Sequence, residues 1–301
     1  MRLSLPNLTF VLPPKNYRHT NLNASWKEYN ELVDTLIYLH EKVAEVKVPM
    51  KEYELSGDNL MTKFYFHSHS FHRLMSGFEI SSSFYKKEIN GLKVIDISSS
   101  LIILRAQFET YLMYHHIYVN PKNEDEKELR WYAWMYSSLL NRQSFPSETF
   151  YAKGQKNRDQ DILGRLKAVI PMLPGYAKLT PKMQKALLNS GSGKLFNHWD
   201  KIMAETGYGK NHFLTYFYNF LCTHAHSEGT SILQVKDSHH VFHENNEVAI
   251  TYVSASATII SSLIITIKKR YKIVEIVYNT LPQQRQECIE YYDLLAKNTY
   301  H

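Results

Sequence analysis

Residues 94–120 read VIDISSSLIILRAQFETYLMYHHIYVN and form the longest stretch of the chain with a clear helical period. Apolar residues recur in it at intervals of three and four, which is typical of a helix with one buried face. The stretch ends before Pro121, because the residue that precedes a proline disfavours helical backbone angles. The pattern therefore predicts a buried helix. The residues that carry the period are Ile97, Leu101, Leu104, Phe108 and Leu112.

Two charged residues interrupt this apolar helix. Arg105 and Glu109 lie one turn apart, and Leu112 and His116 continue the same line along the helix. A lone charge in so apolar a segment is costly to bury, so the two residues must pair or find other partners. One interpretation is a structural ion pair that fixes the register of the helix. The other is a polar site inside a helical bundle.

The composition sets the broad class of the protein. The 301 residues are enough for one large domain or two modest ones, and the net charge of +6 is compatible with a nucleic-acid partner without requiring one. The two cysteines, Cys222 and Cys288, form no disulfide framework, so we expect a cytoplasmic protein. Prolines near the N-terminus predict that residues 1–24 form an extended arm.

The stretch from Val248 to Ile267 allows two interpretations. It runs for twenty residues without a charge and is followed by Lys268, Lys269 and Arg270, so its length and basic flank fit a membrane span. Seven of the twenty residues are Ser or Thr, however, and this favours a helix buried in the centre of a protein. We therefore expect a core helix and no membrane partner.

The remaining segments predict an all-α protein whose centre is an antiparallel helical bundle. We expect residues 25–301 to form a single helical domain, in which residues 144–208 are a helical insertion. Residues 144–157 are polar and contain Pro146 and Gly154, so they are predicted to be a loop. Residues 78–89 fit a helix or a small hairpin. The other predicted helices cover residues 26–45, 59–75, 124–142, 159–172, 180–189, 195–206, 211–226, 237–272 and 283–297, and Ser25 is the predicted N-cap of the first.

Two motifs carry a resemblance to a known family. The sequence R-A-Q-F-E places Arg105 and Glu109 four residues apart, and Y-N-F-L-C-T-H-A-H places Tyr218, Cys222 and His226 at successive turns. These motifs, in residues 95–120 and 210–235, resemble a bacterial helical family of unknown function that is often found near mobile-element and phage-defence genes. Its members carry an Arg-x3-Glu helix and later a Tyr-x3-Ser-x3-His helix, in which Cys222 replaces the usual Ser. The family is similar in outline to HEPN-type helical ribonucleases, which implies an RNA partner.

Metal-free cleavage of RNA needs three chemical groups. A base takes the proton from the ribose 2′-hydroxyl, an acid protonates the leaving oxygen, and a cation stabilises the charge that develops on the phosphate. His226 is the expected base, Arg105 is the expected cation, and Glu109 orients one of them. The HEPN signature places a histidine four to six residues after the arginine on one helix, and no arginine of this chain has a histidine at that spacing.

Other residue patterns suggest other chemistry. His69 with His72 and His239 with His243 have spacings that suit metal ligation, but the chain has no Glu-x-x-His sequence of the kind that bundle metal sites use. The sequence around Lys194 lacks the glycine spacing of a phosphate loop. Cys222 shares a helical face with His226, although a core thiol is the simpler interpretation.

The sequence supports one main hypothesis and two alternatives. The main hypothesis is a cytoplasmic protein of the bacterial defence type that binds or cleaves RNA without a metal or a cofactor, with a homo-oligomer or a partner protein possible. The first alternative is a non-catalytic interaction or regulatory module with a structural Arg–Glu pair, and the second is a histidine-rich metal protein. The catalytic candidates are Arg105, Glu109 and His226, and the substrate-binding candidates are His116, Tyr218 and His224.

Overall fold

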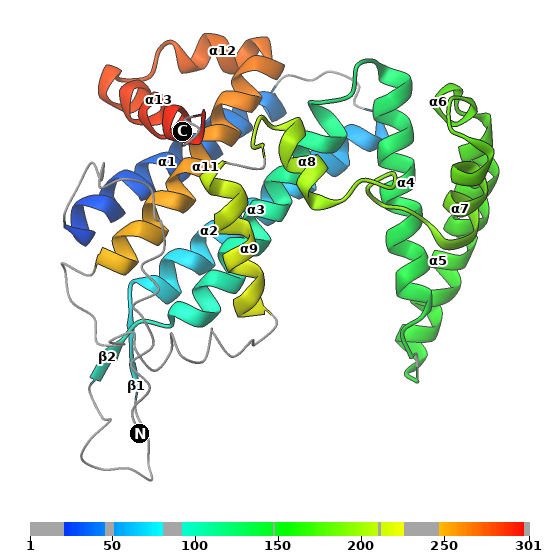
Figure 1. The fold of residues 1–301 in the computed structure, drawn as a ribbon, viewed down its shortest axis with the longest axis horizontal. Coiled ribbons are helices and arrows are strands. Elements are labelled where there is room, and N and C mark those ends of the chain that lie inside the picture. Colours follow the sequence, from blue (N-terminus) through cyan, green and yellow to red (C-terminus); the bar gives the residue numbers. More distant parts are fainter. Residues whose placement is uncertain are drawn as a thin grey trace. The chain divides into compact units, whose positions relative to one another are not determined.

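The computed structural model describes residues 21–45, 51–80, 92–146, 148–209, 212–225 and 247–297. These residues are predominantly helical, which confirms the predicted all-α class. In this part of the chain the only strands are one short antiparallel pair, in which Glu79 faces Lys93 across the register. The elements are α1 (Leu22–Glu45), α2 (Glu52–Met75), β1 (Phe78–Ile80), β2 (Leu92–Val94), α3 (Ile97–Tyr118), α4 (Glu124–Gln143), α5 (Phe150–Val169), the 3-10 helix η1 (Ile170–Met172), α6 (Pro174–Ala177), α7 (Pro181–Ser190), α8 (Trp199–Glu205), α9 (Phe213–Ala225), α11 (Glu247–Arg270), α12 (Lys272–Tyr278) and α13 (Gln283–Lys297), as Figure 1 shows.

The chain is divided into two compact units. Unit 1 takes residues 1–48, 60–111 and 207–301, and unit 2 takes residues 49–59 and 112–206. The boundaries between the units therefore fall inside α2 and α3. The predicted insertion, residues 144–208, belongs to unit 2 as far as Thr206, but unit 2 also includes residues 49–59 and residues 112–143.

Helix α11 lies at the centre of unit 1. It packs against α1, α12 and α13, and Figure 1 shows α1 running alongside it. Nearly every side chain from Ala249 to Ile267 is buried, including most of its serines and threonines. It is the one described helix that is long and apolar enough to cross a membrane, and 89% of its most apolar window is buried within the structure. The uncharged stretch is thus enclosed by protein.

A buried hydrogen-bond network links four helices of unit 1. Gln107 of α3 donates its side-chain amide to Ser68 Oγ of α2 at 2.8 Å and accepts from Ser256 Oγ of α11 at 2.7 Å. The Tyr29 hydroxyl of α1 donates to the carbonyl of Ser68 at 3.0 Å. Neither Ser68, Gln107 nor Ser256 has any exposed surface. Because a buried polar group is stable only when hydrogen-bonded, this network fixes how the four helices meet.

The first helix begins earlier than the sequence suggested. Residues 1–20 of the predicted arm lie outside the described residues, and the chain is helical from Leu22. Asn21 is the cap, because its side-chain oxygen accepts from the backbone N–H of Asn23 at 2.9 Å. The predicted cap, Ser25, instead donates its hydroxyl to the carbonyl of Asn21. Leu22, four residues before Trp26 and completely buried, continues the apolar period, so the sequence held a signal for this earlier start.

Unit 2 contains a helical hairpin of α4 and α5, whose core also includes η1, α6 and α7. The prediction of a loop at residues 144–157 was wrong, because α5 begins at Phe150. Thr149 Oγ1 accepts from the backbone N–H of Ala152 at 3.1 Å and so caps the helix. This cap and the packing of α5 on α4 outweigh the roughly 1 kcal/mol by which Gly154 disfavours a helix.

Replacing Gln107 with Leu should destabilise unit 1 by about 2 kcal/mol, because the buried hydroxyls of Ser68 and Ser256 each lose a partner. The measurement is urea unfolding followed by fluorine NMR of fluorotryptophan-labelled protein, since Trp26 is the one tryptophan in the residue ranges of unit 1. Gln283→Leu, at an exposed site of α13, is the control. A Gln107→Leu protein as stable as this control would show that the network contributes little.

Candidate functional site

The charged pair predicted on the central helix is present in α3. Arg105 Nε donates to Glu109 Oε1 at 3.0 Å. The side chains are 20% and 28% exposed, so the pair lies at the edge of unit 1 and is neither sealed in the core nor freely solvated. The intermediate position leaves part of the guanidinium open to solvent while its geometry is held by the carboxylate.

Tyr218 of α9 completes this cluster. Its hydroxyl donates to the same oxygen, Glu109 Oε1, at 2.8 Å, and its ring lies 5.7 Å from the Arg105 guanidinium carbon. The ring also meets Phe108 of α3 edge to face, at a centroid distance of 6.0 Å. Two helices that are far apart in sequence therefore place a cation, a carboxylate and a phenol in mutual contact. We call Arg105, Glu109 and Tyr218 the Arg–Glu–Tyr cluster.

Aromatic packing explains the position of α9. Phe220 stacks on Tyr252 of α11 at a centroid distance of 6.2 Å, and Phe217 lies at the same distance from that ring. Such pairs stabilise beyond the area that they bury. Leu214 and Leu221 are completely buried on this helix, so its apolar face is held in unit 1 and Tyr218 is placed reproducibly.

The electrostatics of the cluster favour one protonation state. Burial lowers the pKa of Arg105, but the charge of Glu109, together with smaller contributions from Cys222 and Tyr218, raises the pKa overall. Burial, and then the charge and hydrogen bond of Glu109, raise the pKa of Tyr218 far above its ordinary value. At neutral pH Arg105 is therefore a cation and Tyr218 a hydrogen-bond donor. Cys222, one turn after Tyr218, also interacts electrostatically with both groups.

The other predicted site residues are placed differently. His226 lies outside the described residues. His224 is buried, 2% exposed, and its ring meets Phe220 edge to face at 4.9 Å, so it belongs to the packing of α9. His116 is completely buried in unit 2, in a network of its own. The structure thus brings together Arg105, Glu109 and Tyr218.

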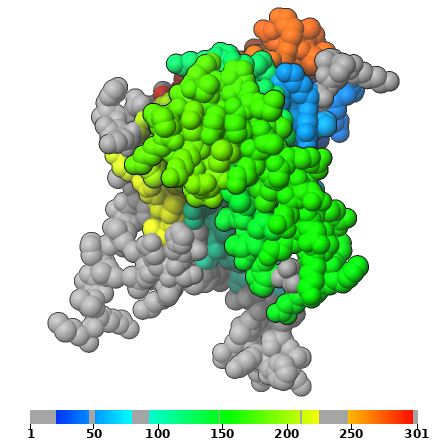
Figure 2. Space-filling model, turned by 90° about the vertical axis from the view of Figure 1, so that its right-hand side faces the viewer, coloured from blue at the N-terminus to red at the C-terminus, as the bar shows by residue number. Residues whose placement is uncertain are grey.

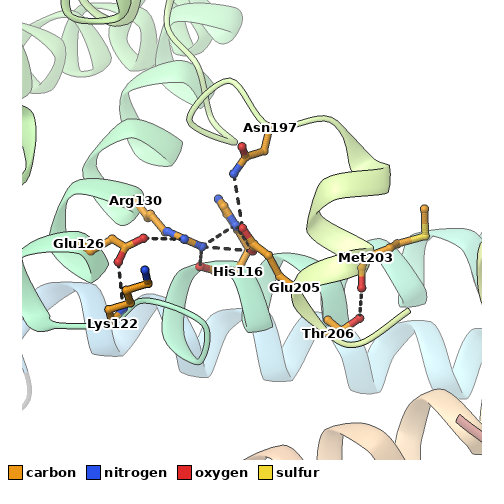
Figure 3. A network of polar contacts seen from close by, with 8 residues as sticks. All are labelled: His116, Lys122, Glu126, Arg130, Asn197, Met203, Glu205 and Thr206. Atoms are coloured by element: carbon orange, nitrogen blue, oxygen red, sulfur yellow. Dashed lines mark hydrogen bonds and ion pairs between the residues drawn. The ribbon is translucent and has the colours of Figure 1, made fainter. Parts of the chain in front are cut away.

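The network around His116 joins three helices of unit 2, as Figure 3 shows. Glu205, the last residue of α8, lies 2.7 Å from His116 Nδ1 and 3.2 Å from Arg130 Nη1. Arg130 of α4 also donates to the carbonyl of His116 at 2.7 Å and to Glu126 at 2.7 Å. A carboxylate at a helix C-terminus is disfavoured by the helix dipole, and the arginine offsets this effect.

The Nδ1 atom of His116 lies between a carboxylate and a guanidinium. His116 Nδ1 lies 2.7 Å from a carboxylate oxygen of Glu205 and 2.8 Å from the donor Arg130 Nη1. A proton on Nδ1 satisfies Glu205, and Arg130 then donates to the nearby carbonyl and carboxylate oxygens. Burial raises the pKa of Glu205, but the hydrogen bond and charge of His116 and the charge of Arg130 lower it overall.

The described histidines do not form a metal site. Within the described ranges, no group of three or more His, Cys, Asp or Glu side chains is placed to hold a metal ion. His72 meets the ring of Trp26 edge to face at 4.5 Å and stacks on Tyr29, so it packs among aromatic residues. Burial lowers its pKa. His239 and His243 lie outside the described residues.

Comparison of the chain with family models, curated proteins and solved structures found no match. The site is therefore interpreted from its own geometry.

Sequence reasoning missed several polar residues that organise the structure. Glu126 and Arg130 lie four residues apart, which is the spacing of a helical ion pair, so their contact could have been predicted from the sequence. Gln107 was also recognisable as an amide in an apolar helix. Glu205 gave no signal, because its partners are 75 and 89 residues away.

Replacing Glu205 with Gln should destabilise unit 2 at neutral pH by about 2 kcal/mol, because buried Arg130 loses a counter-ion. The pKa of Glu205 is lowered by folding, so its contribution is full above the ordinary carboxyl pKa and is lost as the pH falls through the lower, folded value. The difference in unfolding free energy between wild type and variant should therefore shrink below about pH 4. Urea titrations across this range measure it, with exposed Asp161→Asn as the control. A difference in unfolding free energy that stays constant with pH would contradict the pairing of the Glu205 carboxylate with Arg130.

Proposed function

We propose that this protein binds RNA and cleaves it without a metal ion, with Arg105 as the phosphate-binding cation, Glu109 and Tyr218 as positioning residues and His226 as the general base. The observation that supports this proposal most is the state of Arg105. It is charged, 20% exposed, and oriented by a carboxylate on its own helix. A fixed guanidinium that still reaches solvent is suited to a phosphate group.

The proposed reaction uses the 2′-hydroxyl of the substrate. His226 takes the proton of that hydroxyl, and the oxygen attacks the adjacent phosphorus. The bond to the 5′-oxygen of the next nucleotide breaks, which gives a 2′,3′-cyclic phosphate and a 5′-hydroxyl that receives a proton. Arg105 neutralises the charge on the phosphate oxygens as the bond forms. In the sequence, His226 directly follows Ala225, the last described residue of α9, and α9 carries Tyr218.

Glu109 and Tyr218 act through Arg105 in this proposal. Glu109 accepts from Arg105 Nε, which leaves the other guanidinium nitrogens directed away from that contact. Tyr218 donates to Glu109 and prevents the carboxylate from turning away. His116 and His224, which the sequence suggested as substrate ligands, are buried and have no substrate contact in this mechanism.

A non-catalytic interaction module is the second candidate, and one observation favours it. A single oxygen of Glu109 accepts hydrogen bonds from both Arg105 and Tyr218, which is the arrangement of a structural tie between α3 and α9. In that case the cluster holds the helices together, and the exposed edge of Arg105 has no substrate.

The test is cleavage of labelled RNA with EDTA present, compared with a substrate carrying one 2′-deoxynucleotide. Wild type should release a cyclic phosphate, and the deoxy position should resist cleavage. His226→Ala should abolish cleavage with an unchanged melting temperature, and Arg105→Lys should slow it about 100-fold, because a planar donor is lost. His198→Ala, at an exposed site of unit 2, is the control. Absence of cleavage by wild type, together with a destabilised His226→Ala protein, would favour the interaction module.

A further inference from the structure

The closed end of the α4–α5 hairpin exposes an unusual group of aromatic side chains. Phe145 is 61% exposed, Phe150 is 95% exposed and Tyr151 is 75% exposed. These are three of the five most exposed large hydrophobic side chains among the described residues. Single exposed apolar residues are common on protein surfaces, but a cluster within seven positions marks a binding surface. We call Phe145, Phe150 and Tyr151 the aromatic tip; the α4–α5 hairpin that carries it forms the bright green surface in Figure 2.

The aromatic tip is held by hydrogen bonds. Lys156 Nζ donates to the carbonyl of Phe145 at 3.2 Å, and the side-chain amide of Gln143 donates to the carbonyl of Lys156 at 3.1 Å. One turn further from the tip, Arg142 of α4 makes a two-pronged ion pair with the buried Asp159 of α5. The exposed rings are therefore presented by an ordered hairpin.

Positively charged residues follow the rings along α5. Lys153 and Arg158 are exposed on α5, and Lys156 is partly exposed between them. Glu148 is the one acidic residue in the described part of the segment 144–158. The combination of exposed rings and cations is complementary to a polyanion with flat apolar faces, since rings stack on bases and cations contact phosphates.

Gly154 leaves space beside Phe150. A Cβ atom added at this glycine would meet nothing within 4 Å, so the helical face between Phe150 and Arg158 is unobstructed. A base stacked on the Phe150 ring could lie against this face, with its phosphate near Arg158 one turn further on. The exposed side chains are aromatic rings, and every nucleic-acid base has a flat face on which such a ring can stack.

We propose that the aromatic tip, with Lys153 and Arg158, binds single-stranded nucleic acid through base stacking and phosphate contacts. This surface belongs to unit 2, whereas the Arg–Glu–Tyr cluster belongs to unit 1. The proposal does not depend on RNA cleavage.

The test measures the affinity of the full chain for labelled single strands by fluorescence anisotropy. The probes are a 2′-O-methyl RNA, which cannot be cleaved through its 2′-oxygen, and a DNA of the same sequence. Phe150→Ala combined with Tyr151→Ala should weaken binding at least tenfold, because each stacked base is worth about 1–3 kcal/mol. Phe66→Ala, which removes a 67% exposed ring from α2, should leave the affinity unchanged. The RNA and DNA arms decide which strand is preferred.

A second pair of variants tests the charges. Lys153→Ala combined with Arg158→Ala should reduce the slope of log affinity against log salt concentration by roughly 1.4, the value for two phosphate contacts on a single strand. Lys182→Ala with Lys185→Ala, on α7, is the matched control and should leave the slope unchanged. All these positions are exposed, so the variants should melt like wild type.

Two outcomes would overturn the proposal. The first is a wild-type protein that binds neither single strand, or a Phe150→Ala, Tyr151→Ala variant that binds as tightly as wild type. The second is tip-dependent binding to phosphatidylserine vesicles with no binding to either oligonucleotide, which would assign the tip to a membrane surface. Failure of the cleavage assay leaves tip-dependent binding intact, so the two proposals fail separately.

Discussion

The structure of unit 1 depends on the need to satisfy polar groups around a buried, uncharged helix. Helix α11 is rich in Ser and Thr, and most of these residues are inaccessible to solvent. The hydroxyl groups of some of these residues form hydrogen bonds within the helix itself. Thr258 and Thr266 each donate to the carbonyl four residues earlier. Ser256 instead donates to Gln107 of α3, so a single amide connects the central helix to its neighbour.

This amide also lies on the buried face of α3. Gln107 is completely buried, while Arg105 and Glu109, two residues before and after it, are partly exposed. A step of two residues turns an α-helix by about 200°, so the charged pair lies on the side opposite the amide. We infer that the buried network sets the rotation of α3 about its axis. That rotation presents Glu109 to Tyr218 of α9.

The sequence predicted the helical class, the central helix and the charged pair, because these follow from local periodicity and from the cost of a lone buried charge. It could not predict the contact of Tyr218 with Glu109 from spacing, since 109 residues separate them. The start of α5 was missed because its N-cap, Thr149, is one polar residue within a polar segment. Such a residue gives no distinct sequence signal for a helix start. The partners of Glu205 depend on tertiary packing, which cannot be predicted from the periodicity of the sequence.

We infer that Gln107 positions the Arg–Glu–Tyr cluster. A double-mutant cycle of Gln107→Leu and Tyr218→Phe tests it, with unfolding free energies measured in urea and Tyr216→Phe, at an exposed site of α9, as the control partner. If Gln107 sets the rotation of α3, the loss of the Tyr218 hydroxyl should matter less in the Gln107→Leu protein, with a coupling energy on the order of 1 kcal/mol. Effects of Gln107→Leu and Tyr218→Phe that add to within about 0.3 kcal/mol would show that the two sites are independent and would contradict the claim.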